Sequence, residues 1–209
     1  LGCACYRAGR TAETAEKYVE LNKRAVEAYK EAADLFKETG NRSEELECEA
    51  EVLFARGLVA ASVAEGKKAL SQSYELFIES SELYSKEGDR ESFARTLSRA
   101  VMASGLLVTY CSDRWEIEQL CQKGRDVADK AWKLLKEVRD LQSLTDSLFA
   151  ETLLGAAEMF IVAFRWDKRW REYLKKFLLK FDESLKLVEG CDDPKILGTI
   201  CLMAGSWYC

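Results

Sequence analysis

The stretch Ala25-Val-Glu-Ala-Tyr-Lys-Glu-Ala-Ala-Asp-Leu-Phe-Lys-Glu-Thr-Gly-Asn41 decides the fold, because it returns further along the chain with the same residue classes at the same spacings. The clearest second copy spans residues 73–89, at an offset of 48 positions throughout (73 − 25 = 48). Weaker copies span residues 128–140 and 181–193. A period of about 50 residues indicates an array of helical repeats.

Each copy ends with the same pair of signals. Aromatic and aliphatic residues at helical spacing are followed by Gly or Arg and then by Asn or Asp, as in Gly40-Asn41 and Gly88-Asp89. A left-handed residue, usually Gly, commonly ends a helix, and Asn or Asp commonly caps the start of the next one. The pattern therefore predicts pairs of amphipathic helices joined by short turns.

This pattern resembles the tetratricopeptide repeat. The run Ala25-x-x-x-Tyr29-x-x-Ala32, followed by Leu35-Phe36-x-x-x-Gly40-Asn41, looks like the second helix and exit turn of the variety found in regulatory scaffolds. The small residue of the preceding helix falls at Gly57, Gly105 and Ala156. The period of about 50 exceeds the family's period of about 34, so each helix is expected to be longer by a turn or more.

The resemblance implies an all-α fold, an antiparallel helix-pair solenoid that forms a right-handed superhelix of about four repeats. We expect residues 1–209 to form one such domain. Helices are expected at 1–9, 11–39, 43–63, 67–87, 91–110, 115–138 and 144–164, with Gly66 ending the third of them. The chain starts and ends inside helical patterns, so we interpret it as a fragment of a longer protein.

Composition supports the helical prediction and narrows the function. A single proline and 48% hydrophobic residues leave little room for β-hairpins. A net charge of −5 argues against a general nucleic-acid binder, which would carry a basic excess. No apolar run approaches the roughly 18 residues that a membrane span requires, so none is predicted.

Catalysis, metals and cofactors are not indicated. The chain has no histidine, no Gly-rich phosphate loop and no nucleophile elbow, so we predict no enzyme and no cofactor. Cys3 and Cys5 point to different sides of a helix, and none of the eight cysteines forms a Cys-x-x-Cys pair. We expect reduced, mostly buried thiols in a cytoplasmic protein, with Cys111 and Cys121 as the first pair to test for a disulfide.

The repeat register predicts a row of charges, which we call the charged row: Glu47, Glu51, Arg95, Arg99 and Asp146. The 48-residue offset places Arg95 over Glu47 and Arg99 over Glu51, and an offset of 99 brings Asp146 to the level of Glu47. One reading is a set of surface ion pairs between neighbouring repeats. The other is a groove that offers both arginines to an acidic peptide or a chain-terminal carboxylate.

Residues 165–180, the basic segment, interleave charge with aromatic residues. The segment holds seven basic and two acidic residues. Its most concentrated part consists of Arg165, Trp166, Lys168, Arg169, Trp170 and Arg171. It is either a solvated turn between helices or a docking patch for nucleic acid or an anionic surface.

These observations predict a scaffold or regulatory module that binds a peptide or a helix of a partner protein in its groove. Binding of nucleic acid or an anionic surface through the basic segment is one alternative. A small-molecule sensor with its pocket beside the apolar helix 144–164 is another. The apolar C-terminal helix, residues 196–209, lacks the polar face of an array end and predicts a homodimer contact or a further helix.

Overall fold

The computed structural model describes residues 1–162, 168–188, 193, 196 and 198, and every regular element in this part of the chain is helical. The elements are α1 (Gly2–Gly9), α2 (Ala15–Thr39), α3 (Arg42–Leu58), α4 (Val63–Glu87), α5 (Arg90–Leu107), the 3₁₀ turn η1 (Val108–Tyr110), α6 (Arg114–Val138), α7 (Leu141–Val162) and α8 (Lys168–Val188). The predicted all-α class is therefore confirmed. The helices α2, α4 and α6 each contain 25 residues, as expected for a long period.

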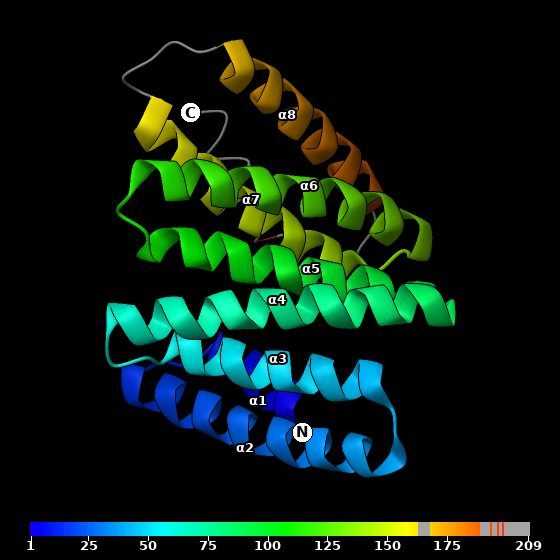
Figure 1. The fold of residues 1–209 in the computed structure, drawn as a ribbon. Helices are drawn as coiled ribbons and strands as arrows, with labels where there is room; N and C mark the ends of the chain where they lie inside the picture. The colour runs from blue at the N-terminus through cyan, green and yellow to red at the C-terminus, as the bar shows by residue number, and fades with distance from the viewer. Residues whose placement is uncertain (163–167, 189–192, 194–195, 197, 199–209) are drawn as a thin grey trace.

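The helices are stacked along one direction in chain order (Figure 1). Helices α2 to α6 lie side by side, each antiparallel to the one before it, while α1 and α7 lie behind them in this view. Every helix from α1 to α7 packs against the next one in the chain, and α5 packs against α7 as well.

Helices one repeat apart also contact each other. Arg99 of α5 bonds to Glu51 of α3, 48 positions earlier, at 2.6 Å. Lys67 of α4 bonds to Glu116 of α6, 49 positions later, at 2.6 Å. Positions about one sequence period apart therefore lie close together in space between α3 and α5 and between α4 and α6.

The predicted helix stops at Gly40, Gly88 and Arg139 are confirmed. Gly40 and Gly88 have φ of 75° and 81°, and Arg139 takes the same left-handed conformation with φ of 57°. Residues other than glycine are disfavoured in this left-handed conformation, so the turn at Arg139 carries some strain.

The predicted helix starts are confirmed in part. The carboxylates of Asp89 and Asp140 each accept a hydrogen bond of 3.0 Å from the backbone N–H three residues on. Asn41 occupies the same position before α3 without such a side-chain bond. Satisfying a free N–H of the first turn typically stabilises a helix by about 1 kcal/mol.

Several predicted boundaries are wrong; for example, α3 ends at Leu58 instead of Val63, and α4 begins at Val63 instead of Lys67. The second helix begins at Ala15 instead of Thr11, because the Thr14 hydroxyl caps the N–H of Lys17. Gly66 does not end a helix but lies inside α4, which Ser62 caps. A Cβ at Gly66 would fall 2.6 Å from the ring of Tyr110, so this glycine gives the ring room and is not a stop signal.

The repeat extends back to α1. A Cβ at Gly9 would lie 3.1 Å from the side chain of Asn22, and one at Gly57, 48 positions later, would lie 2.7 Å from Leu70. Each glycine thus faces the residue 13 positions further on. The match indicates that α1 packs on α2 in the same register in which α3 packs on α4.

One buried apolar cluster runs through the stack, with members from α1 to α8. Within it, the rings of Tyr6, Phe54 and Phe77 form an edge-to-face series with centroid distances of 5.8 and 6.4 Å. Aromatic pairs in this geometry stabilise a core beyond the area they bury. The series ties α1, α3 and α4 together.

Some predictions fall outside the described residues. These are the placement of Arg165 and Trp166, the turn at Pro194, and the dimer contact assigned to residues 196–209, of which only Ile196 and Gly198 are described. Among the described helices, none combines the length and hydropathy needed for a membrane span.

Five cysteines lie in the described part of the chain, and all of them are free. The bridge between Cys111 and Cys121 is not formed; the thiol of Cys111 donates to the carbonyl oxygen of Leu107 and that of Cys121 to the carbonyl oxygen of Leu154, each at 3.4 Å. Burial raises the pKa of Cys48 to about 12 and that of Cys121 to about 12. Cys3, in contrast, is exposed.

We therefore expect Cys3 to react with iodoacetamide at pH 8 at least about ten times faster than Cys48 or Cys121. The thiolate is the reacting form, and a pKa of about 12 leaves very little of it at that pH. Peptide mapping by mass spectrometry after timed labelling measures the three rates separately. Equal rates in the folded protein, or recovery of a peptide linking Cys111 to Cys121, would contradict the structure.

Candidate functional site

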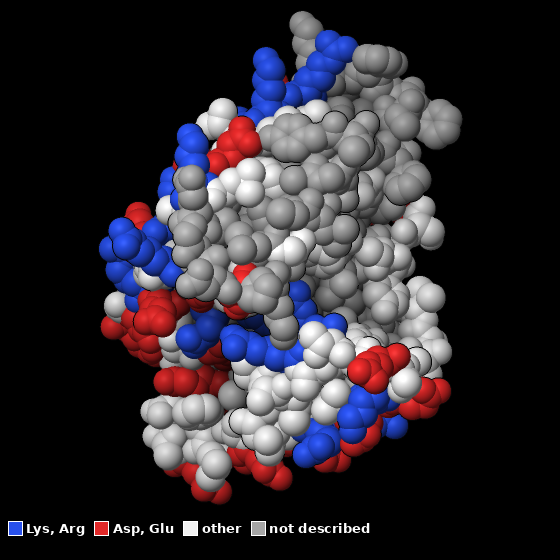
Figure 2. Space-filling view, turned by 180° about the vertical axis from the view of Figure 1, so that it is seen from behind, with Lys and Arg blue, Asp and Glu red and all other residues white. Residues whose placement is uncertain are grey.

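The charged row lies on the side of the molecule formed by α1, α3, α5 and α7, which we call the odd-helix face. Figure 1 places α1 and α7 behind the other helices, so the view from behind in Figure 2 looks onto this side. A band of Lys and Arg side chains crosses the middle of that view, beside Asp and Glu side chains. The residues of the charged row take part in three separate interactions.

The first interaction joins Arg95 to Glu47. The guanidinium lies 3.4 and 3.5 Å from the two carboxylate oxygens, and it also donates to Ser92 at 3.2 Å. The Arg95 side chain is 41% exposed. Glu47 has a second and shorter partner, the hydroxyl of Tyr84 at 2.7 Å. The predicted ion pair therefore forms, but its nitrogen–oxygen distances are long. The Glu47 carboxylate would keep a hydrogen-bond partner, Tyr84, without Arg95.

The second interaction joins Arg99 to Glu51 and is much tighter. Two parallel hydrogen bonds of 2.6 and 2.5 Å connect them, and the two side chains are only 11% and 9% exposed. The guanidinium carbon of Arg99 also lies 4.3 Å from the ring centroid of Phe54 and 4.7 Å from that of Tyr6. The arginine thus combines a two-bond ion pair with cation–π contacts to α1 and α3.

The third interaction was not predicted. Asp146 of α7 accepts a hydrogen bond of 2.8 Å from Arg10, which directly follows α1 and lies 136 positions earlier. Asp146 also accepts one from Gln142 at 3.1 Å. Burial alone would lower the pKa of Arg10, but the charge of Asp146 outweighs it and raises that pKa. The pair connects the first and fourth helices of the odd-helix face.

The three arginines in these interactions, Arg10, Arg95 and Arg99, differ in how accessible they are to an external ligand. Arg99 is buried, and Arg10 holds Asp146 at hydrogen-bond distance. The guanidinium of Arg95 is the most exposed of the three and has the longest ion-pair distances. Within the charged row, Arg95 is therefore the point at which an external carboxylate can bind with the least rearrangement.

The basic segment is only partly described. Lys168, Arg169 and Trp170 lie in the first turn of α8, and Arg171 follows them as an exposed residue. Lys180, the last cation of the segment, is held between carboxylates: it lies 2.9 Å from Glu151 and also pairs with Asp129. Lys180 therefore joins α8 to α7 and α6 and does not add to an accessible basic patch.

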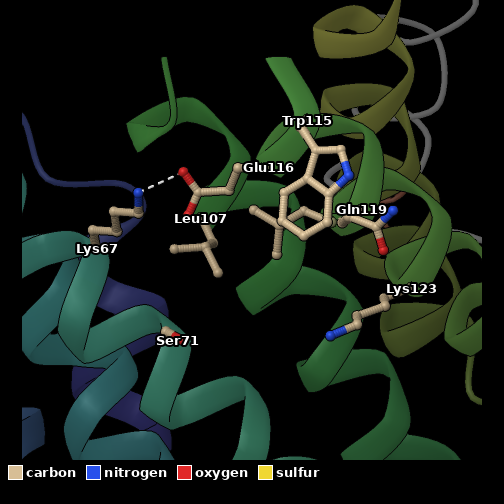
Figure 3. A pocket seen from close by; sticks show the side chains of 8 residues that line it. Lys67, Ser71, Leu107, Trp115, Glu116, Gln119 and Lys123 are labelled. Carbon is tan, nitrogen blue, oxygen red and sulfur yellow. Dashed lines mark hydrogen bonds and ion pairs between the residues drawn. The ribbon is translucent and has the colours of Figure 1, made fainter. Parts of the chain in front are cut away.

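A pocket of about 250 Å³ opens between α4 and α6 (Figure 3). We call it the α4–α6 pocket; its lining residues are Lys67, Ser71, Leu107, Trp115, Glu116, Gln119, Leu120 and Lys123. None of these residues belongs to α7, whereas the sequence predicted a small-molecule pocket beside the helix 144–164. No pattern in the sequence marked this site.

In the described part of the chain, no group of three Cys, Asp or Glu side chains is arranged to hold a metal ion. No model of a known protein family matches the chain, and a comparison with curated proteins finds no match either. The resemblance to the tetratricopeptide repeat therefore stays a prediction from the repeat pattern.

Proposed function

We propose that this chain is a protein-interaction module, a scaffold or regulatory array of tetratricopeptide-like helix pairs that binds a peptide or helix along its odd-helix face. Contacts between helices one repeat apart support the proposal, because they hold equivalent positions in line over a long surface. We expect a cytoplasmic location, in which thiols such as the five free cysteines stay reduced.

The loosely paired Arg95 carries the proposal. Arginine suits the recognition of carboxylates because its planar fork can donate two parallel hydrogen bonds. A guest carboxylate that draws Arg95 outward would not leave Glu47 without a partner, since the hydroxyl of Tyr84 remains bonded to it at 2.7 Å. The exchange therefore avoids the penalty for an unsatisfied buried acceptor. An acidic peptide is the guest that this arrangement favours.

The test is a selection from a random peptide library displayed on phage, with the purified chain as bait. We expect enrichment of peptides with one or more carboxylates beside apolar residues, and an affinity about 10–100 times lower for Arg95→Ala, the range of a lost charge-assisted hydrogen bond. Fluorescence polarisation with the selected peptides measures both constants.

The matched control is Arg90→Ala. Arg90 is also an exposed arginine of α5 that pairs with a carboxylate, that of Glu137, but it does not belong to the charged row. Its substitution should leave peptide affinity unchanged, and equal melting temperatures would show that both variants are folded. Selection of peptides without acidic residues, or equal affinity losses in the two variants, would reject the proposal.

A further inference from the structure

The α4–α6 pocket combines an exposed aromatic ring with an apolar floor. The side chain of Trp115 is 70% exposed, although tryptophan is usually covered in a folded protein. Leu107, which is only 3% exposed, and the half-buried Leu120 line the same pocket. In Figure 3 the indole stands at the edge of the pocket opposite Lys67 and Ser71. An apolar group that enters here would be covered by an aromatic ring and two leucines.

The polar lining of the pocket consists of two lysines, one carboxylate and two neutral side chains that can donate or accept hydrogen bonds. Lys67 is already neutralised by Glu116 at 2.6 Å (Figure 3). Lys123 extends its ammonium group toward the α4 side, and within the described residues it has no ion pair. Ser71 and Gln119 have no side-chain hydrogen bond to another described residue either. One positive charge and two neutral side chains able to donate hydrogen bonds therefore remain available.

These features together define a ligand with an apolar ring and a single negative charge. A phosphate monoester carries up to two charges at neutral pH, whereas the lining offers one uncompensated cation, so a carboxylate is the better match. A volume of about 250 Å³ lies just below the usual range of about 300–1,000 Å³ for ligand pockets, which restricts the ligand to a small molecule.

We propose that the α4–α6 pocket binds a small aromatic carboxylate, with its ring against Trp115 and Leu107 and its carboxylate on the ammonium group of Lys123. This site goes beyond the peptide-binding function, because it lies between even-numbered helices and shares no residue with the charged row. Occupancy would link α4 to α6 and so stiffen the contact between two repeats.

The test uses three probes with the same ring: 3-phenylpropionate, its neutral amide 3-phenylpropanamide, and the cation 2-phenylethylammonium. The readout is the indole N–H signal of Trp115 in ¹⁵N-labelled full chain, identified among the five tryptophans by its absence in Trp115→Phe. We expect 3-phenylpropionate to shift this signal with a dissociation constant on the order of 1 mM, as its size allows. The amide should bind about fivefold more weakly, and the cation should produce no saturating shift.

Lys123→Gln should weaken 3-phenylpropionate about fivefold, while Lys133→Gln, an exposed lysine of α6 outside the pocket, should not. Arg95→Ala should also leave this titration unchanged, so failure of ligand binding in the pocket and failure of peptide binding can be told apart.

The proposal is overturned by an unmoved Trp115 signal, by equal binding of acid and amide, or by equal effects of the two lysine variants. Tighter binding of the peptide acetyl-Asp-Phe-amide than of 3-phenylpropionate would overturn the small-molecule assignment in favour of a protein segment.

Discussion

Replacing Arg99 by methionine is expected to lower the free energy of unfolding by about 3–5 kcal/mol, the range for breaking a buried ion pair by removing one partner. Methionine keeps much of the apolar contact with the rings of Tyr6 and Phe54 but leaves Glu51 buried without its cation. Most of the loss comes from this uncompensated carboxylate. Urea denaturation followed by circular dichroism measures it.

The control is Arg95→Met, one helical turn earlier on α5. Arg95 is 41% exposed, and Glu47 retains its bond to Tyr84, so we expect a loss of at most about 1 kcal/mol. Replacing both partners, as in Glu51→Leu with Arg99→Met, should restore much of the stability, because no buried charge remains. Equal losses for the two arginine variants would show that Arg99 acts as an ordinary surface residue.

The loss in Arg99→Met should also depend on pH in a definite direction. Burial raises the pKa of the Glu51 carboxyl, and removing Arg99 removes the main influence that opposes this shift. The folded variant then binds a proton more readily than the unfolded chain, so its stability increases as the pH falls through the raised pKa toward the ordinary value. The deficit relative to wild type should therefore be smaller at pH 5 than at pH 8.

Gly105→Ala is expected to destabilise the fold by about 2–3 kcal/mol, although alanine is normally favoured over glycine inside a helix by about 1 kcal/mol. A Cβ at Gly105 would lie 2.8 Å from the carbonyl oxygen of Ala150 and 3.0 Å from its Cα. These are backbone atoms of α7, so relief requires moving a whole helix away from α5. The urea midpoint should fall without a large change in slope.

Gly124→Ala provides the comparison for this substitution. A Cβ there would meet a methyl group of Leu154 at 2.6 Å and the hydroxyl of Ser104 at 2.8 Å. Both are side-chain atoms that can shift by rotation, so we expect a loss of no more than about 1 kcal/mol. If Gly105→Ala were the milder of the two, α5 and α7 would not pack as closely as the structure shows.

The repeat pattern predicted much of the helical architecture. The left-handed residues Gly40, Gly88 and Arg139 end their helices where the pattern placed the stops. The pairing of Arg95 with Glu47 also followed from the 48-residue offset alone. Such features are accessible from sequence because a cap depends on neighbouring residues, and a contact between repeats depends on one constant offset.

The same reasoning failed where a contact does not follow the period. The pairing of Arg10 with Asp146 spans 136 positions, which is not a multiple of the repeat length. In the sequence, Gly66 resembled a helix stop. Its role is instead to leave room for the ring of Tyr110, and this could not be seen locally because Tyr110 lies far along the chain. The α4–α6 pocket likewise arises from two helices whose facing side chains carry no shared motif.

By itself, the sequence determined the all-α class, the helix stops at Gly40, Gly88 and Arg139, and the register that brings Arg95 to Glu47 and Arg99 to Glu51. These features depend on local propensity and a fixed repeat length. Only the tertiary structure decided that Arg99 is buried beneath aromatic rings while Arg95 remains exposed. Exposure depends on how closely α1 and α3 approach each arginine, and that distance is set by the packing of the whole stack.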